Sequence, residues 1–307
     1  MKVTALDREG RPGHPPATDS QGSPAAEPAT APGPGLDAAG ITVAYDGVDV
    51  VHEADLSLPR GRVTALIGPN GSGKSTLLRA IARLHRARTG SVTMFAEGDE
   101  ADGTVDALAL SRTEFARRAT LLAQSRTAPA GISVREVVGF GRHPYRHRFR
   151  GTDPDGTRLV EHALAVTNTT GLADRGVESL SGGQLQRVWL ACCLAQDTDV
   201  LLLDEPTTYL DLRYQVEILD LVRELADTHG VTVGVVLHDL DQAAAVADKV
   251  VLLSAGRVVA AGTPAEVYDT ERLTGTYGIR IEVDLDPATS IPRTRAVGRH
   301  HLRPERP

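Results

Sequence analysis

Apolar residues along this chain follow two different spacings. Nearly unbroken apolar runs occupy residues 62–67, 200–203 and 231–237, without regular alternation with polar residues. Such runs are typical of central strands in a parallel sheet, which are covered on both faces. In residues 74–84 and 212–226 the apolar positions recur every three or four residues, as on one face of a helix. The sequence therefore predicts an α/β fold with a mostly parallel sheet.

Other segments predict smaller parts of the fold. Short apolar segments at residues 41–45, 48–58 and 91–95 indicate further strands. From about residue 125 to residue 180 the strand pattern gives way to helical spacing. We interpret this segment as a helical insert in the α/β domain. Residues 250–260 indicate a hairpin.

Both ends of the chain differ in composition from the part between them. Residues 1–40 are dominated by Pro, Ala, Gly and Ser, and such a segment buries too little apolar surface to offset the entropy of ordering. Residues 284–307 are polar and contain Pro. We therefore expect a disordered N-terminal tail, one ordered domain over residues 41–283 and a loose C-terminal tail.

The segment from Gly68 to Thr76 carries the clearest chemical signal. It fits the phosphate-loop pattern G-x-x-x-x-G-K-[ST], and it lies between a predicted strand and a predicted helix. Glycines let the backbone curl around a phosphate, and the amides of the loop and of the helix N-terminus then face the anion. Lys74 adds a positive charge for the β- and γ-phosphates, and the Ser75 hydroxyl can bind Mg²⁺. The predicted nucleotide-binding residues here are Gly68, Pro69, Asn70, Gly71, Ser72, Gly73, Lys74, Ser75 and Thr76.

Polar residues follow two of the predicted buried strands. Asp204 and Glu205 come after one strand, and His238 comes after the other. Ligands of open α/β sheets bind at the carboxyl ends of the strands. We expect Asp204 to reach Mg²⁺, usually through water, and Glu205 to polarise an attacking water. An ordinary exit from strand to loop would leave both acids without an obvious counter-charge, whereas His238 is either a structural residue or faces the same phosphate.

Two further segments allow a structural and a functional interpretation. Ser181 is a plausible N-cap of a helix that runs to about Ala195, and the amides that follow Gly182 and Gly183 are free. This segment is either a capping turn without a ligand or a second anion site. Tyr45, in a predicted strand ahead of the phosphate loop, either packs within the strand or stacks on a nucleobase.

Composition limits the classes of partner. The formal net charge of −7 does not suggest affinity for nucleic acid, although residues 142–150 combine arginines with aromatic residues. We interpret residues 142–150 either as a solvated loop or as a docking surface for a partner protein or acidic lipid head groups. The two cysteines are neighbours, which argues against a disulfide between them and suits a reducing cytoplasm. No apolar run of 18 residues and no apolar secretory segment is present in the sequence, so we expect no membrane span.

Taken together, the motifs resemble the ATPase subunit of ABC transporters over about residues 41–282. The residues that carry the resemblance are, in order, Gly68–Thr76, Gln124, Leu180–Gln184, Val200–Pro206, Leu210-Asp211 and His238-Asp239. The resemblance implies a P-loop NTPase core with a mostly parallel sheet, an antiparallel β subdomain and the helical insert. It also implies that the protein binds ATP and Mg²⁺ and couples ATP hydrolysis to transport.

The resemblance assigns roles to individual residues. Tyr45 resembles the residue that stacks on adenine, and His238 resembles the γ-phosphate sensor. Gln124 is similar to the residue that links Mg²⁺ and the lytic water to the transmembrane partner. Asp204 is similar to the Mg²⁺-side acid and Glu205 to the general base. The residues that the resemblance implies would act on ATP bound by a second copy, so that two copies enclose two ATP molecules, are Ser181, Gly182, Gly183, Gln184 and Asp211.

Three segments look like the importers of ferric siderophores, haem and vitamin B12: residues 141–145, 207–211 and 237–243. The resemblance implies a peripheral subunit at the cytoplasmic face of the cell membrane, with transmembrane permease subunits and a substrate-binding protein as partners. We expect import of iron-siderophore complexes. Import of haem or cobalamin, and a soluble ABC-type ATPase that acts on a non-transport partner, stay open as alternatives.

Overall fold

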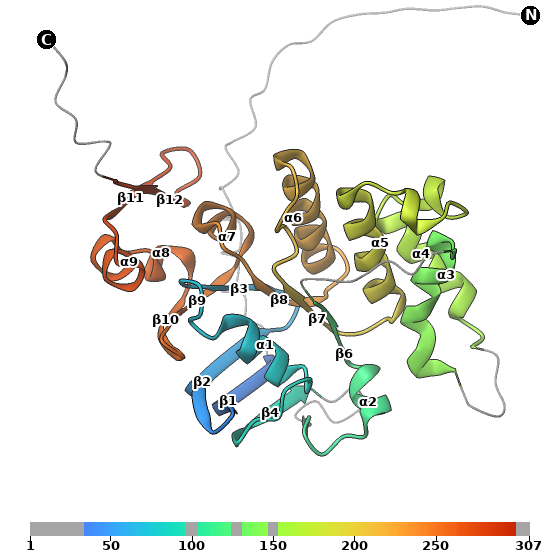
Figure 1. The fold of residues 1–307 in the computed structure, drawn as a ribbon, viewed down its shortest axis with the longest axis horizontal. Coiled ribbons are helices and arrows are strands. Elements are labelled where there is room, and N and C mark those ends of the chain that lie inside the picture. Colours follow the sequence, from blue (N-terminus) through green and yellow to red (C-terminus); the bar gives the residue numbers. More distant parts are fainter. Residues whose placement is uncertain (1–33, 96–102, 124–130, 147–152, 299–307) are drawn as a thin grey trace, which may run out of the picture. The chain divides into compact units, whose positions relative to one another are not determined.

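The largest sheet of the protein is mostly parallel, as predicted. The computed structural model describes residues 34–95, 103–123, 131–146 and 153–298. Within these residues the sheet has the strand order β10-β9-β3-β8-β7-β6 (Figure 1). Its parallel strands are β3 (Val63–Ile67), β6 (Ala119–Leu122), β7 (Val200–Asp204), β8 (Thr232–Val236) and β9 (Lys249–Ser254). Strand β10 (Arg257–Gly262) pairs antiparallel with β9 at one edge.

The central strands are apolar throughout because both faces of the sheet are covered. In β7, Leu201 and Leu203 belong to one hydrophobic core, and Val200 and Leu202 belong to another. The first core also contains residues of α5 (Gly182–Ala195) and α6 (Leu212–Asp227). The second contains residues of α1 (Lys74–Ile81) and of the antiparallel sheet. Successive side chains of a strand point to opposite faces, so each core takes every second residue.

A smaller antiparallel sheet covers the second core. Its strand order is β2-β1-β4-β5, with β1 (Pro34–Tyr45), β2 (Val48–Pro59), β4 (Thr89–Phe95) and β5 (Thr104–Asp106). Our prediction that order begins at Ile41 was wrong, because β1 begins at Pro34 and Leu36 is fully buried. Leu36 pairs with Leu58 on one side and with Met94 on the other. Two neighbouring strands thus supply the backbone hydrogen bonds and apolar cover that composition alone did not reveal.

The helical insert follows the parallel strand β6. Its helices are α3 (Val134–Gly139), the 3-10 helix η1 (Phe140–Tyr145), α4 (Gly156–Val166), and the 3-10 helices η2 (Thr170–Leu172) and η3 (Val177–Ser179), which lead into α5. Helix α3 begins with a capping box between Ser133 and Glu136, and α2 (Arg112–Ala116) begins with one between Ser111 and Glu114. These caps satisfy amide groups that would otherwise be unpaired at the helix starts.

Arg142 corrects the prediction that residues 142–150 form either a solvated loop or a docking surface. It is 4% exposed, and its guanidinium forms an ion pair with Asp153 at 2.7 Å. The same guanidinium donates to the Ala195 carbonyl at 2.9 Å and lies 3.8 Å from the centre of the Tyr145 ring. Arg142 therefore joins η1 to the end of α5 inside the insert. Residues 147–150, which belong to the same prediction, lie outside the described residues.

The chain end folds further than predicted. Helix α7 (Leu240–Val246) follows β8, and α8 (Pro264–Val267) and α9 (Thr270–Tyr277) follow β10. Strands β11 (Ile281–Leu285) and β12 (Pro292–Ala296) then form a hairpin, so the prediction of a loose tail was wrong for residues 284–296. Residues 299–307, the end of the predicted tail, lie outside the described residues. The amide and hydroxyl of Thr294 both donate to Asp241 of α7. The hairpin is thus tied to a helix that precedes it by about fifty residues.

No helix in the described part of the chain combines the length and the apolar character that crossing a lipid bilayer requires.

Candidate nucleotide-binding site

The loop between β3 and α1 adopts a backbone that requires glycine. Gly68, Gly71 and Gly73 have φ angles of 142°, 76° and 97°, in a region that favours glycine. A Cβ atom on Gly68 would lie 2.1 Å from the Leu253 carbonyl oxygen. Gly73 is the N-cap of α1 and supplies no side chain to its first turn. The loop and helix start therefore leave backbone amides for an anion.

Lys74 lies folded over this loop. Its ammonium group donates to the carbonyl oxygens of Gly68 at 2.8 Å and Pro69 at 3.0 Å, and the residue is 4% exposed. Burial lowers the pKa of Lys74 below its ordinary value, whereas the negative charges of Glu205 and Asp204 act to raise it. The two acids predicted at the end of β7 thus share their electrostatic environment with the phosphate-loop lysine.

Asp204 is buried and has a counter-charge that the sequence did not suggest. Its Oδ2 atom accepts from Arg79 of α1, at 2.8 Å from Nη2 and 3.0 Å from Nε. Its Oδ1 atom is buried and has no hydrogen-bond partner among the described residues, and the same holds for Ser72 Oγ in the phosphate loop. Buried polar atoms are rarely left without a partner. A carboxylate oxygen is a donor that suits a hydrated Mg²⁺, so Asp204 Oδ1 fits the expected role.

Glu205 and His238 meet, as expected for residues that follow neighbouring strands. His238 Nε2 lies 2.6 Å from Glu205 Oε1, and the Thr208 hydroxyl donates to Glu205 Oε2 at 3.3 Å. An ordinary exit from strand to loop therefore does not describe these acids, because Arg79 pairs with Asp204 and His238 contacts Glu205. Glu205 has a φ angle of 55°, which is uncommon for a residue with a side chain. Such a backbone costs about 1–3 kcal/mol and tends to occur at functional sites.

Tyr45 ends strand β1 and is 41% exposed. Its ring packs edge-to-face against His85, with ring centres 5.3 Å apart. The ring therefore has a packing partner within the chain, and its stacking on a nucleobase stays a prediction. Gln124 lies outside the described residues, so its expected role stays a prediction.

Ser181 caps helix α5 as predicted. Its hydroxyl accepts from the Gln184 amide at 3.4 Å, and the Gln184 side chain accepts from the Ser181 amide at 3.0 Å. Gly183 is buried, and a Cβ atom there would lie 2.4 Å from the Tyr214 ring of α6. Helices α5 and α1 pack in different cores on opposite faces of the sheet. The described contacts therefore do not bring Ser181 or Gly183 to the phosphate loop of their own chain.

The residues before α6 are open to solvent. Asp211 is the N-cap of α6 but forms no capping hydrogen bond through its side chain. Tyr209 is 95% exposed and has a φ angle of 64°. Both residues lie in the loop that leads away from Glu205. No contact with another described residue explains the predicted role of Asp211 in nucleotide binding, so that role stays a prediction.

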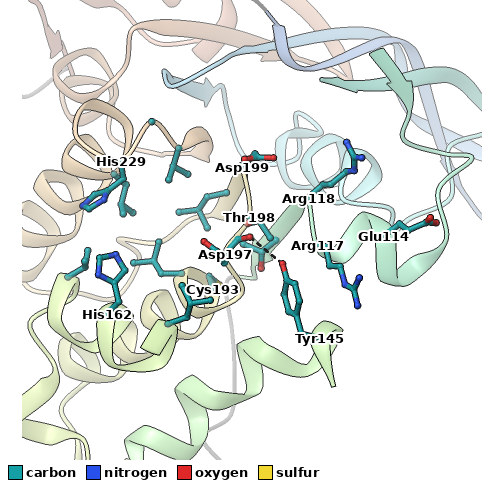
Figure 2. A pocket seen from close by; sticks show the side chains of 18 residues that line it. Glu114, Arg117, Arg118, Tyr145, His162, Cys193, Asp197, Thr198, Asp199 and His229 are labelled. Atoms are coloured by element: carbon teal, nitrogen blue, oxygen red, sulfur yellow. Dashed lines mark hydrogen bonds between the residues drawn. The ribbon is translucent and has the colours of Figure 1, made fainter. Parts of the chain in front are cut away.

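The cavity in Figure 2 lies elsewhere and has a different character. Its lining includes residues next to the starts of β7 and β8, at the edge of the sheet opposite to Asp204. Its volume of about 590 Å³ would suit a small molecule. In Figure 2, His162 and His229 form an edge-to-face pair, and the Tyr145 hydroxyl donates to the Asp197 carbonyl at 3.4 Å. None of the predicted site residues lines this cavity.

Arg79 is the site residue that sequence reasoning missed. It follows Ser75 by four positions on α1, so the two side chains lie on the same helix face. This spacing was readable from the sequence. The partner of Arg79, however, is Asp204, which lies 125 residues later in the chain, on strand β7.

Comparison with known proteins agrees with this geometry. A family described as "ABC transporter" matches residues 51–208. The achromobactin transport ATP-binding protein of Dickeya dadantii is 41% identical over 84% of this chain and 93% of its own length. The ferric enterobactin transport ATP-binding protein of Escherichia coli is 40% identical over the same shares. A cobalamin import ATP-binding protein of Halobacterium salinarum is 41% identical over 83% of this chain and 61% of its own length.

Two solved structures show the same fold. One is titled as an inward-facing ABC transporter of metal-chelate type, with a TM-score of 0.74, 25% identity, and coverage of 87% of this chain and 98% of that one. Another is a dimeric bacterial ABC transporter cassette, with a TM-score of 0.62, 25% identity, and coverage of 74% and 98%. With the phosphate loop and the paired acids in place, the chain belongs to the ABC transporter family as one of its ATP-binding proteins.

Proposed function

We propose that this protein hydrolyses MgATP between two copies of itself and thereby powers the import of iron-siderophore complexes. The observation that carries the proposal is the meeting of four groups near the carboxyl ends of β3, β7 and β8. The ammonium of Lys74 covers the phosphate loop, Asp204 and Glu205 act on its charge, and His238 contacts Glu205. Such a site has a phosphate cradle, a cation ligand and a base.

In the proposed reaction the phosphate loop and Lys74 bind the β- and γ-phosphates. Ser75 and Asp204 would hold Mg²⁺, whose charge would offset that of the phosphate oxygens. Glu205 orients the attacking water and accepts its proton. His238, which contacts Glu205 in the described structure, contacts the γ-phosphate and keeps the base in register. Each role is one that these residue types perform in phosphoryl transfer.

The second copy follows from the placement of α5. The start of α5 lies on the opposite face of the sheet from α1, and its exposed residues Ser181 and Gly182 could contact ATP held by another copy. Asp211 and Tyr209, which follow Glu205 closely in the chain, are exposed and would be accessible to such a second copy. The dimeric structure of a related cassette supports this arrangement.

Permease subunits would bind the protein at the cytoplasmic face of the membrane, and a substrate-binding protein would deliver the cargo. Relatives named for achromobactin and ferric enterobactin support a siderophore cargo. The relative named for cobalamin keeps that cargo as a second candidate. The ATP-binding subunit does not line the path of the cargo, so the site itself is compatible with either.

A test combines hydrolysis with capture of partners. The purified protein should release phosphate from ATP only when Mg²⁺ is present, and absence of hydrolysis with and without membrane partners would reject the proposal. The Glu205→Gln variant with MgATP should retain a polytopic permease from solubilised membranes, identified by mass spectrometry. Recovery of soluble partners alone would replace the importer with an ABC-type ATPase that acts on a non-transport partner.

A further inference from the structure

We infer that Arg79 is a positioning residue that sets the orientation of the Asp204 carboxylate toward the Mg²⁺ of bound nucleotide. The inference rests on the proposed function, because it assumes that Asp204 faces Mg²⁺. Among the described residues, Arg79 contacts one of the two carboxylate oxygens of Asp204. Both Nη2 and Nε of Arg79 reach Oδ2, and no described residue donates to Oδ1.

The geometry of the pair distinguishes a positioning contact from a simple neutralising one. An arginine that only neutralises a carboxylate commonly binds both oxygens in a fork, because this adds a hydrogen bond. Here the two donors share one oxygen, and the other oxygen stays buried without a donor. Asp204 has a fully buried side chain, so its rotation is limited by packing as well as by Arg79. The carboxylate is therefore fixed with one oxygen available.

Helix α1 connects this contact to the rest of the cation site. Ser75, whose hydroxyl is the proposed Mg²⁺ ligand, lies in the first turn of α1, and Arg79 lies one turn later on the same face. The helix is rigid over this distance, so Arg79 fixes Asp204 of β7 relative to Ser75. The oxygen atoms of Ser75 and Asp204, which come from separate elements, are thus held at fixed relative positions before the nucleotide binds. Mg²⁺ demands near-ideal octahedral geometry, and such register favours its binding.

The direction of the expected effect follows from this role. A guanidinium beside a carboxylate lowers the local negative charge, so if it acted only by charge, its removal would tighten cation binding. If it acts by orientation, its removal weakens cation binding. Loss of an outer residue that orients a metal ligand typically costs roughly tenfold to a hundredfold in metal affinity. We expect removal of the Arg79 guanidinium to weaken cation binding.

The experiment measures Mn²⁺ binding to the full-length protein loaded with ADP, by electron paramagnetic resonance of the free ion. Arg79→Gln should weaken Mn²⁺ binding about tenfold, and Arg79→Lys, which keeps the charge but lacks the paired donors, should weaken it less. The affinity for ADP in EDTA should stay unchanged. Arg83→Gln is the matched control, because Arg83 lies just after α1 and donates to the Leu110 carbonyl rather than to Asp204. This variant should leave Mn²⁺ affinity unchanged.

A double-mutant cycle separates positioning from a structural role. In the Asp204→Asn background, Arg79→Gln should have no further effect on Mn²⁺ affinity. Tighter or unchanged Mn²⁺ binding in both Arg79 variants, or an equal loss in the Asp204→Asn background, would overturn the inference. Failure of the unaltered protein to bind ADP or Mn²⁺ would instead reject the proposed function, so the two outcomes are distinct.

Discussion

Single side chains at the ends of β7 and β8 decide what the site can do. Glu205 is held by His238 and by the Thr208 hydroxyl on a backbone with positive φ. This arrangement leaves little freedom to the carboxylate. A base is effective only when its position relative to the reacting water is fixed. The neighbouring Asp204 contacts a different partner, Arg79, which is compatible with separate proposed roles for the two acids.

Glu205→Gln should abolish most hydrolysis while nucleotide still binds. The amide keeps the size of the side chain but cannot accept a proton, and general-base catalysis contributes roughly a hundredfold to ten-thousandfold to rate. Phosphate release and nucleotide titration measure the two properties. Glu224→Gln, an exposed position on α6, is the control and should behave like the unaltered protein. Hydrolysis by Glu205→Gln at the normal rate would remove Glu205 from this role.

Lys74→Ala should act on binding itself. The Lys74 ammonium group, which donates to two loop carbonyls in this structure, would donate to the phosphates when ATP binds. Hydrogen bonds to charged groups are worth about 1.5–3 kcal/mol each. We expect roughly tenfold to hundredfold weaker binding of ATP, measured by calorimetry. Unchanged affinity would contradict the phosphate-loop interpretation.

Between helices, the contact of α5 with α6 explains why residue 183 is glycine. The Tyr214 ring occupies the space that a Cβ atom would need. Gly183→Ala should therefore destabilise the protein by about 1–3 kcal/mol, measured by urea unfolding. Adding Tyr214→Ala should make the double variant more stable than the sum of the two single changes predicts.

Activity of this double variant separates packing from ligand approach. If the glycine serves only packing, hydrolysis should return with stability. If the backbone at Gly183 must also approach ATP of a second copy, hydrolysis should stay low in a stable double variant. Additive effects on stability would show that Tyr214 is not what excludes a side chain at residue 183.

The ion pair of Arg142 with Asp153 joins η1 to the segment before α4 within the insert. Its contribution to the free energy of unfolding depends on pH. The hydrogen bond from Arg142 is the largest cause that lowers the pKa of Asp153 below its ordinary value of 3.8. Because the folded state binds this proton more weakly than the unfolded state, the stabilisation is complete at neutral pH. It is lost as pH falls below 3.8 through the lower folded pKa.

Asp153→Asn should consequently lower the free energy of unfolding at pH 7 by about 2 kcal/mol, since it leaves a buried guanidinium without its charge partner. The difference from the unaltered protein should shrink as the pH falls below 3.8. Urea unfolding at several pH values measures this change. Asp155→Asn is the control, because its partner Arg158 is exposed and such surface pairs contribute little. A difference that is constant with pH would contradict the ion-pair explanation.

For the whole molecule, the main prediction concerns a second copy. Helices α1 and α5 lie on opposite faces of the sheet. Within one chain, the segment Leu180–Gln184 at the start of α5 therefore cannot close on the phosphate loop at the start of α1. The Glu205→Gln protein should therefore dimerise when MgATP is added and return to monomer when the nucleotide is removed. Size-exclusion chromatography with light scattering measures the mass. Adding Ser181→Arg, which places a large charge at the start of α5, should prevent this dimer, and a monomer at saturating MgATP would contradict the arrangement.

Sequence alone determined what depends on neighbours along the chain. The glycines of residues 68–73, the apolar runs of β7 and β8, and the cap at Ser181 follow from backbone sterics, hydrophobic spacing and local hydrogen bonds. These features predicted the α/β fold and named the candidate site residues. The sequence placed Glu205 and His238 each after a buried strand, but their contact depends on the pairing of β7 with β8.

Only the tertiary structure decided which distant groups meet. The pairing of β7 with β8 and the packing of α1 bring Arg79 to Asp204, across 125 residues. The same holds for the start of β1, which is ordered by β2 and β4, and for the hairpin that Asp241 anchors. Local composition cannot predict these features, because their hydrogen bonds and burial come from partners that are remote in the chain.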